Sequence, residues 1–422
     1  MSFELGLHCR DCGKQFPSQP LAACDECFAP LDVRYDLEGI GHAVSPQSLA
    51  GRPHTLWRYR ELLPVPAQPH PRERPVGGTP LVAAPALAKA LGVRELYLKN
   101  DAVNFPTLSF KDRVVATALS KAREFGFTTV ACSSTGNLAN ALAAGAAAEG
   151  FESYIFTPAD LEEAKIVNTL VYGARLIKFR GNYDHVNRLC SELAQRYPWG
   201  IVNVNLRPYY AEGSKTVGYE IAEQMGWRLP GALVCPMAGG SLIGKIAKAF
   251  NELRQLGWVA SPGEGVRICG AQASGCSPIS RAVKEGREEI APQRPNTMAR
   301  SLAVGNPADG FYAARTIRQT GGWAEDASDA EIVAGMQLLA RTEGIFGETA
   351  AGVTVAVAQK LIAQQRIASD RPLVLVITGN GLKTLDAVSR IQAPIPVLAP
   401  KLSNLEAYLA APLPPALTPS AA

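Results

Sequence analysis

One lysine of this sequence stands in a setting that could do chemistry. Lys111 lies between Phe110 and Asp112, just before an apolar-periodic stretch, Val114–Ala122, that predicts a helix. A buried lysine can lose its proton and form a Schiff base with an aldehyde. A lysine at the start of a helix is also common on protein surfaces. The segments that follow Lys111 must therefore decide between these two interpretations.

Three loops that contain glycine follow Lys111: Ser133–Asn137, Ala238–Leu242 and Thr378–Lys383. At least two of them join a predicted strand to a predicted helix, where glycines let backbone N–H groups approach an anion closely. The run from Ala238 to Leu242 fits a single phosphate better than a dinucleotide, because its spacing is not Gly-x-Gly-x-x-Gly. A lysine, a phosphate loop and a partner for a ring nitrogen are what pyridoxal phosphate (PLP) requires.

The order of these motifs resembles that of the threonine synthases, PLP enzymes of the tryptophan-synthase-β type. The resemblance runs from about Val76 to about Asp386 and includes Gly78–Leu81, Glu212–Thr216 and Glu343–Phe346. It implies an α/β fold, that of the type-II PLP enzymes. Two doubly wound parallel-sheet domains would hold the cofactor between them.

The resemblance also assigns roles to individual residues. Lys111 would be the catalytic and Schiff-base residue, Phe110 would pack near the cofactor ring, Asn137 would bond the ring hydroxyl and Thr378 would face the pyridine nitrogen. The cofactor phosphate would lie on Ala238, Gly239, Gly240, Ser241 and Leu242. Many threonine synthases have an asparagine in this last loop, whereas this chain has the more general glycine-glycine-serine form.

The substrate contacts follow the same resemblance. The loop Ser133, Ser134, Thr135 and Gly136 would bind the substrate carboxylate. Many threonine synthases place an arginine shortly before the Glu-Gly pair, but here Tyr210 stands in that register. We therefore expect Arg207 and Lys215 to contact a substrate phosphate.

The reaction implied is that of a carbon–oxygen lyase, which converts O-phosphohomoserine and water to L-threonine and phosphate by γ-elimination and β-addition of water. Three alternatives stay open. The chain could be a cysteate synthase acting on phosphoserine and sulfite, or a threonine/serine dehydratase. It could also be a zinc-ribbon regulatory protein on a catalytically dead body.

Four cysteines lie within the first 27 residues, as two Cys-x2-Cys pairs: Cys9, Cys12, Cys24 and Cys27. Such pairs can place four thiolates around one structural Zn²⁺, although free thiols are the alternative. Residues 1–40 carry three basic and seven acidic side chains, which would repel a nucleic acid. We expect a zinc ribbon packed on the enzyme, with a structural role.

The rest of the chain divides by composition. We expect the ribbon over 1–40, a linker and extension over 41–78, a catalytic body over 79–393 with its smaller domain at about 115–215, and a Pro/Ala-rich tail over 394–422. Strand–helix alternation predicts parallel sheets, as in Ser153–Phe156, the helix of 161–172 and Arg175–Phe179.

The composition limits the classes of partner that the chain is expected to bind. A net charge of +4 over 422 residues gives no reason to expect a polyanion, and no apolar run has the length of a membrane helix. No signal peptide is recognised at the start of the sequence, so the expected location is the cytoplasm. The expected partners are a small phosphorylated amino acid and a second copy of the chain in a homodimer.

Overall fold

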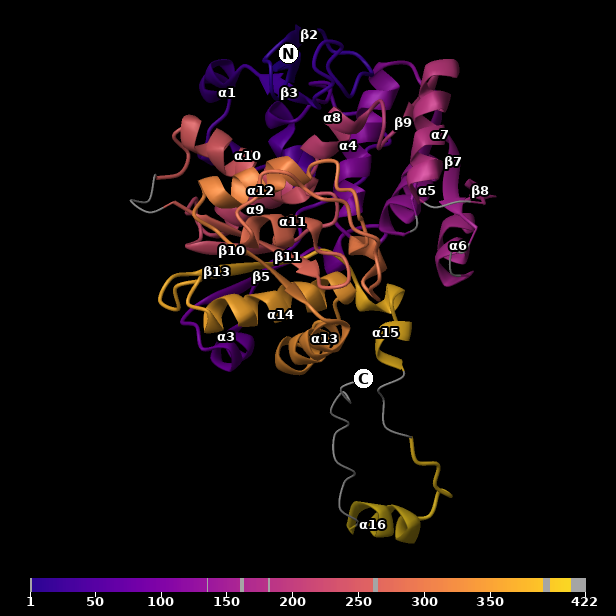
Figure 1. Cartoon of the computed structure of the whole chain (residues 1–422), viewed down its shortest axis with the longest axis vertical. Coiled ribbons are helices and arrows are strands. Elements are labelled where there is room, and N and C mark those ends of the chain that lie inside the picture. Colours follow the sequence, from indigo (N-terminus) through magenta and orange to yellow (C-terminus); the bar gives the residue numbers. More distant parts are fainter. Residues whose placement is uncertain are drawn as a thin grey trace.

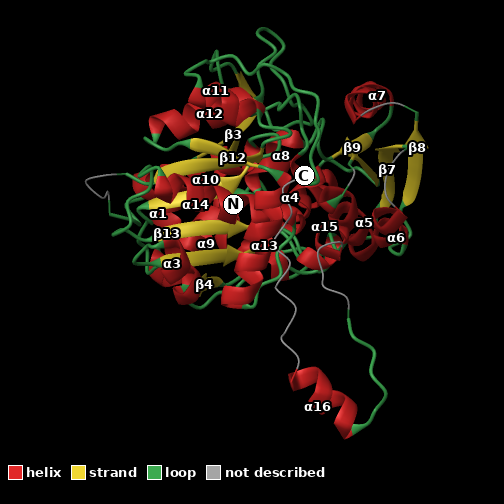
Figure 2. Cartoon of the chain, turned by 60° about the horizontal axis from the view of Figure 1, so that its bottom comes forward, coloured by secondary structure: helices red, strands yellow, loops and turns green. Residues whose placement is uncertain are grey.

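The computed structural model describes residues 2–134, 136–159, 163–180, 183–260, 265–389 and 395–410. Two predominantly parallel sheets and one small antiparallel sheet make up its strands (Figures 1 and 2). The predicted α/β fold of a type-II PLP enzyme is confirmed. Thr135, the end of the predicted body at 390–393, and residues 394 and 411–422 of the predicted tail lie outside the described residues.

The larger sheet has six strands in the order β12-β11-β10-β13-β5-β4. All neighbours are parallel except β4, which is antiparallel to β5. The strands are β12 (Ala324–Ala327), β11 (Arg267–Ala273), β10 (Ala232–Pro236), β13 (Leu373–Ile377), β5 (Leu96–Asn100) and β4 (Leu81–Ala83).

Helices cover both faces of this sheet, because its central strands are apolar on both sides. In β13, Leu373, Leu375 and Ile377 pack in one core, while Val374 and Val376 pack in the opposite one. The first face is covered by α3 (Pro85–Leu91), α13 (Asp329–Glu343) and α14 (Thr349–Ala363). The second face is covered by α9 (Lys215–Gln224), α10 (Ser241–Gln255), α11 (Pro278–Lys284) and α12 (Gly310–Gln319).

The smaller sheet has four parallel strands in the order β8-β7-β6-β9. They are β8 (Arg175–Phe179), β7 (Glu152–Pro158), β6 (Thr129–Ser133) and β9 (Trp199–Ile201), with helices α4 (Lys111–Glu124), α5 (Asn137–Glu149), α6 (Glu163–Leu170) and α7 (Tyr183–Arg196). α4 and α5 pack closely, since a Cβ added at Gly145 would lie 2.7 Å from the Leu119 side chain. The predicted alternation of strands and helices in this region is confirmed.

The cysteine-bearing segment forms a three-stranded antiparallel sheet of β1 (Glu4–Cys9), β2 (Gln15–Phe16) and β3 (Leu31–Tyr35). It packs on α4 and α8 (Arg207–Glu212), where the Tyr35 hydroxyl donates a 2.7 Å hydrogen bond to Glu212 and Lys121 pairs with Glu4 at 2.6 Å. The ribbon is therefore joined to the catalytic body, although the predicted domain limits themselves stay predictions.

Shorter elements complete the chain: α1 (Leu37–Ala43), α2 (Pro46–Leu49), α15 (Asp386–Ser389), α16 (Leu402–Ala410), and the 3-10 turns η1 (Leu56–Leu62), η2 (Asp101–Val103), η3 (Arg300–Leu302) and η4 (Gly381–Lys383). No helix or strand lies between η1 and β4, where the predicted linker and extension of 41–78 ends. α16 lies apart from the rest of the molecule (Figure 2). None of the described helices has both the length and the apolar character needed to cross a membrane.

Candidate active site

A cavity of about 1770 Å³ lies between the two parallel sheets. It is lined by the segments that follow β6, β10 and β13, the carboxyl ends of parallel strands, where open α/β sheets bind ligands. All three predicted loops meet there: Ser133 and Gly136, Ala238 to Leu242, and Thr378. Segments more than 200 residues apart in sequence therefore share one cavity.

Lys111 is the first residue of α4 and lines this cavity. Its Nζ donates a 3.0 Å hydrogen bond to the Tyr210 hydroxyl and lies 4.5 Å from the centre of the Phe110 ring. Burial lowers the pKa of Lys111 to about 8, with Glu348 opposing the change. Burial also raises the pKa of Tyr210, which keeps its hydroxyl protonated.

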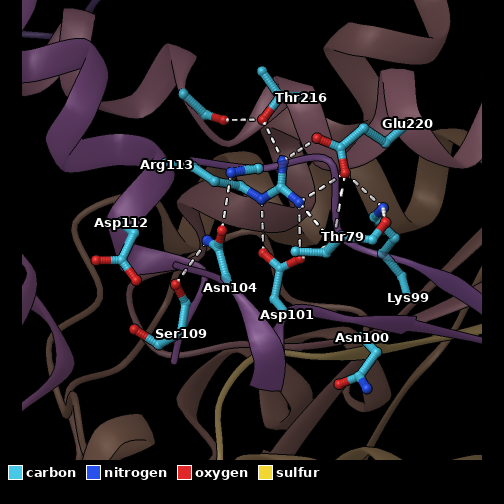
Figure 3. A network of polar contacts seen from close by, with 12 residues as sticks. Thr79, Lys99, Asn100, Asp101, Asn104, Ser109, Asp112, Arg113, Thr216 and Glu220 are labelled. Carbon is cyan, nitrogen blue, oxygen red and sulfur yellow. Dashed lines mark hydrogen bonds and ion pairs between the residues drawn. The ribbon is translucent and has the colours of Figure 1, made fainter. Parts of the chain in front are cut away.

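A buried ionic network around Arg113 fixes the first turn of α4, the helix that begins at Lys111 (Figure 3). Arg113 is fully buried and forms two hydrogen bonds with Asp101, at 2.7 and 2.9 Å. It also bonds both carboxylate oxygens of Glu220, one at 2.8 Å, and Glu220 accepts from Lys99 at 2.6 Å. Burial alone would raise the pKa of Glu220, but Arg113 and Lys99 outweigh it and lower the value to about 2.

The loop before Lys111 is held by its own polar contacts. Asp112 accepts from the Thr107 backbone N–H at 3.1 Å and from the Thr107 hydroxyl at 2.8 Å. The side-chain amide of Asn104 donates to the Ser109 carbonyl at 2.9 Å. Burial raises the pKa of Asp112 to about 6. Lys111 is thus anchored on both sides by its chain neighbours.

The loop Ala238–Leu242 opens α10, a helix of 15 residues whose first N–H groups can receive an anion. Gly240 has φ of +92°, and a Cβ there would lie 2.8 Å from the Asp309 carbonyl oxygen. The Asp309 N–H donates to the Gly239 carbonyl at 2.9 Å. Glycine is required where the loop meets Asp309, and this close approach fixes the loop that is predicted to receive a phosphate.

Glu348 joins the polar residues predicted for the cofactor, and the sequence analysis missed it. It accepts from the Asn137 side-chain amide at 2.8 Å and from the Thr378 hydroxyl at 3.1 Å. Lys383, also missed, donates to the Asn137 side-chain oxygen at 3.1 Å. An acid directly before the apolar helix α14, two residues after the Glu343–Phe346 motif, was the signal available for Glu348.

The predicted carboxylate loop lies at the small-sheet side of the cavity. Ser133, Ser134 and Gly136 line it. The Ser133 hydroxyl is fixed at 2.9 Å from both the Asn187 side-chain oxygen and the Asn203 side-chain nitrogen. Both asparagines also line the cavity and were not predicted as site residues.

The two predicted phosphate contacts differ in outcome. Arg207 lines the cavity and pairs with Asp309 at 2.7 Å. Lys215 is fully buried, outside the cavity lining, and pairs with Glu212 at 2.7 Å and Glu252 at 3.1 Å. The structure therefore does not bring Lys215 to the cavity, where a substrate contact was expected. Its charge is used to compensate buried carboxylates.

The four N-terminal cysteines form one cluster, with all four sulfur atoms within 4.8 Å of one another. Cys9 and Cys27 lie 3.3 Å apart at their sulfurs, and Cys12 and Cys24 lie 3.7 Å apart. Four sulfurs bound tetrahedrally to zinc at 2.3 Å would be about 3.8 Å apart. The cluster therefore fits a structural zinc ion, as the paired spacing predicts.

Comparison with known proteins agrees with this geometry. The model of the pyridoxal-phosphate dependent enzyme family matches residues 73–379. The chain is 36% identical to a threonine synthase of Methanocaldococcus jannaschii, over 90% of this chain and 94% of that protein. It is also 36% identical to a threonine synthase of Methanosarcina acetivorans, over 89% and 92% of the two chains.

Solved structures support the fold alone, because their sequences are distant. A maize serine racemase superposes with a TM-score of 0.59 at 20% identity, covering 72% of this chain and 90% of that one. A threonine deaminase from Solanum lycopersicum gives a TM-score of 0.61 at 21% identity, covering 74% and 87%. With its lysine, glycine loop and four-cysteine cluster, and with threonine synthases as relatives over most of their length, the chain belongs to the threonine synthase family of PLP-dependent enzymes.

Proposed function

We propose that this protein converts O-phosphohomoserine and water to L-threonine and phosphate. One observation carries the proposal: the amine of Lys111 opens into the same cavity as the glycine cup and the guanidinium of Arg207. The cavity thus offers a cofactor lysine and two separate sites for anions, as a phosphorylated amino acid and a phosphorylated cofactor together require. Membership of the threonine synthase family supports the choice of substrate.

The residues present fit PLP. Lys111 would hold its aldehyde carbon, the cup at Gly239–Leu242 its phosphate, Asn137 its ring hydroxyl and Thr378 its ring nitrogen. When bound, the cofactor withdraws electrons from the carbon atoms of the substrate. The hydroxyl of Thr378 is neutral, so it would not hold the ring nitrogen protonated as a carboxylate would. The four cysteines would hold zinc in a closed site with a structural role.

Proton transfer falls to Lys111. With its pKa at about 8, about a tenth of this amine is neutral at pH 7, far more than for an exposed lysine. Once released from the cofactor, the Lys111 amine would take the α proton of the substrate and assist removal of the β proton. Tyr210, at 3.0 Å, would orient the amine. Substrate carboxylate would lie on Ser133, Ser134 and Gly136, and substrate phosphate near Arg207.

The test measures phosphate and threonine together. Purified protein with O-phosphohomoserine should release both in equal amounts, and Lys111→Ala should release neither while keeping its fold. Borohydride reduction followed by peptide mapping should mark Lys111. A label on another lysine would contradict the assignment of Lys111.

The alternatives predict other products. A cysteate synthase would release phosphate from phosphoserine only with sulfite, and a dehydratase would form a keto acid and ammonia from threonine or serine without phosphate. A catalytically dead protein would give no product and no visible cofactor absorption. Any one of these results in place of threonine formation would overturn the proposed reaction.

We further propose that the protein works in the cytoplasm as a homodimer and without a nucleic-acid partner. The acidic ribbon and the near-balanced charge support the last point. Light scattering of the purified protein tests the dimer, and a monomeric mass would contradict it. Titration with labelled DNA and RNA tests the absence of nucleic-acid binding, and salt-sensitive binding would contradict it.

A further inference from the structure

The loop between Cys9 and Cys12 reaches the edge of the active site. Its two residues, Arg10 and Asp11, contact the start of α12 at Asp309 and Tyr312, about 300 residues away in sequence. Arg10 Nη1 lies 3.1 Å from Asp309 Oδ1, and its guanidinium stacks 3.6 Å from the centre of the Tyr312 ring. The Tyr312 hydroxyl donates to Asp11 at 2.8 Å. Three contacts therefore hold this loop in one place.

Asp309 is shared between two arginines. Its Oδ1 pairs with Arg10, while its Oδ2 pairs with Arg207 at 2.7 Å. Asp309 and Arg207 both line the cavity, whereas Arg10 lies behind Asp309 and does not line it. The backbone of Asp309 also bonds the phosphate cup, through its N–H to Gly239 at 2.9 Å. The cysteine-bearing segment is thus connected to both predicted anion sites through one residue.

The charges of Arg10, Arg207 and Asp309 explain how the second arginine, Arg10, affects the binding of an anion. Two guanidinium groups and one carboxylate carry a net charge of +1. With Arg207 and Asp309 alone, the pair would be neutral, and Arg207 would offer its charge to Asp309 and not to a substrate. Arg10 therefore leaves one positive charge for an anion that enters the cavity beside Arg207.

We propose that Arg10 is a positioning residue for the anionic end of the substrate, acting through Asp309 on Arg207. The cysteine-bearing segment, expected from the sequence to be purely structural, then belongs to the specificity apparatus of the enzyme. The inference rests on the proposed function, because it takes the substrate to be a phosphorylated amino acid.

The first test is kinetic and compares three variants of the full-length holoenzyme. Arg10→Gln should raise KM for O-phosphohomoserine about three- to ten-fold with kcat within two-fold, since one charge near the cavity is lost. Arg10→Lys keeps the charge and should restore KM to near the wild-type value. Lys14→Gln is the matched control, because Lys14 pairs at 2.8 Å with Asp25 and Glu26 inside the same segment. Its KM should not change.

A double variant distinguishes an effect of charge from a structural defect by the direction in which KM changes. Arg10→Gln combined with Asp309→Asn removes one charge of each sign and leaves Arg207 with its own charge. Its KM should lie between the KM of Arg10→Gln and that of the wild type. If the contacts of Arg10 and Asp309 were only structural, the second substitution would raise KM above that of Arg10→Gln. A further rise in KM would therefore overturn the proposal.

Inorganic phosphate gives a readout that does not need turnover. Its dissociation constant, read from the visible absorption of the bound cofactor, should rise about three- to ten-fold in Arg10→Gln and not in Lys14→Gln. This measurement separates the two proposals: if wild type ignores O-phosphohomoserine, the proposed reaction fails, while phosphate binding still tests Arg10. Unchanged KM and phosphate affinity in Arg10→Gln would overturn the role of Arg10. So would a defect that Arg10→Lys does not restore and that follows loss of zinc or of thermal stability.

Discussion

Replacing Glu220 by glutamine should test the buried network behind Lys111 most directly. The change keeps the size of the side chain and removes one charge. Arg113 would keep Asp101, and Lys99 would keep the Thr79 carbonyl and Gln224, but both cations would lose a carboxylate. Arg113, Asp101 and Lys99 are all buried, so the lost carboxylate leaves buried charge without its partner.

The magnitude can be worked from the pKa of Glu220. It is about 2 in the folded protein, against about 4.3 for an unperturbed glutamate. At about 1.4 kcal/mol for each pH unit, the difference corresponds to about 3 kcal/mol of stability at pH 7. Removal of one partner from a buried ion pair costs about 3–5 kcal/mol, so the two routes agree.

The sign of the pH dependence follows. Because the pKa of Glu220 is lower in the folded state, its contribution is fully present above about pH 4.3 and is lost as the pH falls toward 2. The difference in unfolding free energy between wild type and Glu220→Gln should therefore shrink by about 1 kcal/mol between pH 7 and pH 3.5.

Equilibrium urea unfolding, followed by tryptophan fluorescence with both proteins in the same cofactor state, measures this difference. Glu192→Gln is a suitable control. Glu192 pairs with Arg188 on the surface of α7, where the two side chains are 61% and 83% exposed, so its loss should cost less than about 0.5 kcal/mol. A difference for Glu220→Gln that is below about 1 kcal/mol at pH 7, or equal at both pH values, would refute the reasoning.

Three further outcomes are expected. Lys215→Met should cost about 3 kcal/mol in urea unfolding, because the buried carboxylate of Glu252 loses the lysine that it pairs with and Glu212 keeps only Lys245 and Lys248, and should leave KM unchanged; a raised KM would return Lys215 to the substrate site. Cys27→Ser should lower bound zinc, measured by metal analysis of protein purified without chelator, and wild type free of zinc would end the metal assignment. Glu348→Gln should lower the pKa of Lys111 below about 8, because Glu348 favours the charged amine. The pH dependence of Lys111 acetylation, read by peptide mapping, should shift to lower pH, and an unshifted profile would contradict this coupling.

Local sequence patterns were sufficient to predict strands, the glycine loop and the cysteine cluster. The apolar run Leu373–Ile377 predicts a buried strand and forms β13, and the glycine loop at Ala238 predicts an anion cup and opens α10. The spacing of the cysteines likewise predicts one cluster, since each pair is local. Such features depend on neighbours in the chain, which a sequence displays directly.

Features that depend on distant segments were missed. Lys215 stands within a family motif, but its environment is made by Tyr35 and Glu252, which belong to other parts of the chain. The pairing of Arg10 with Asp309 joins residues 299 positions apart. The position of a cationic residue in a motif shows that it is close in sequence to site residues. Only the packing of the helices shows which way its side chain points.

The strand order of the larger sheet bears on how the protein folds during synthesis. β5, completed at Asn100, pairs with β13, which begins at Leu373, so about 270 residues separate the two partners. At a ribosomal rate of about 5–20 residues per second, β5 waits about 15–55 seconds for its neighbour. The four strands of the smaller sheet all lie between residues 129 and 201, so this sheet can form within that interval. The active site, which needs both sheets, is assembled only when nearly the whole chain has left the ribosome.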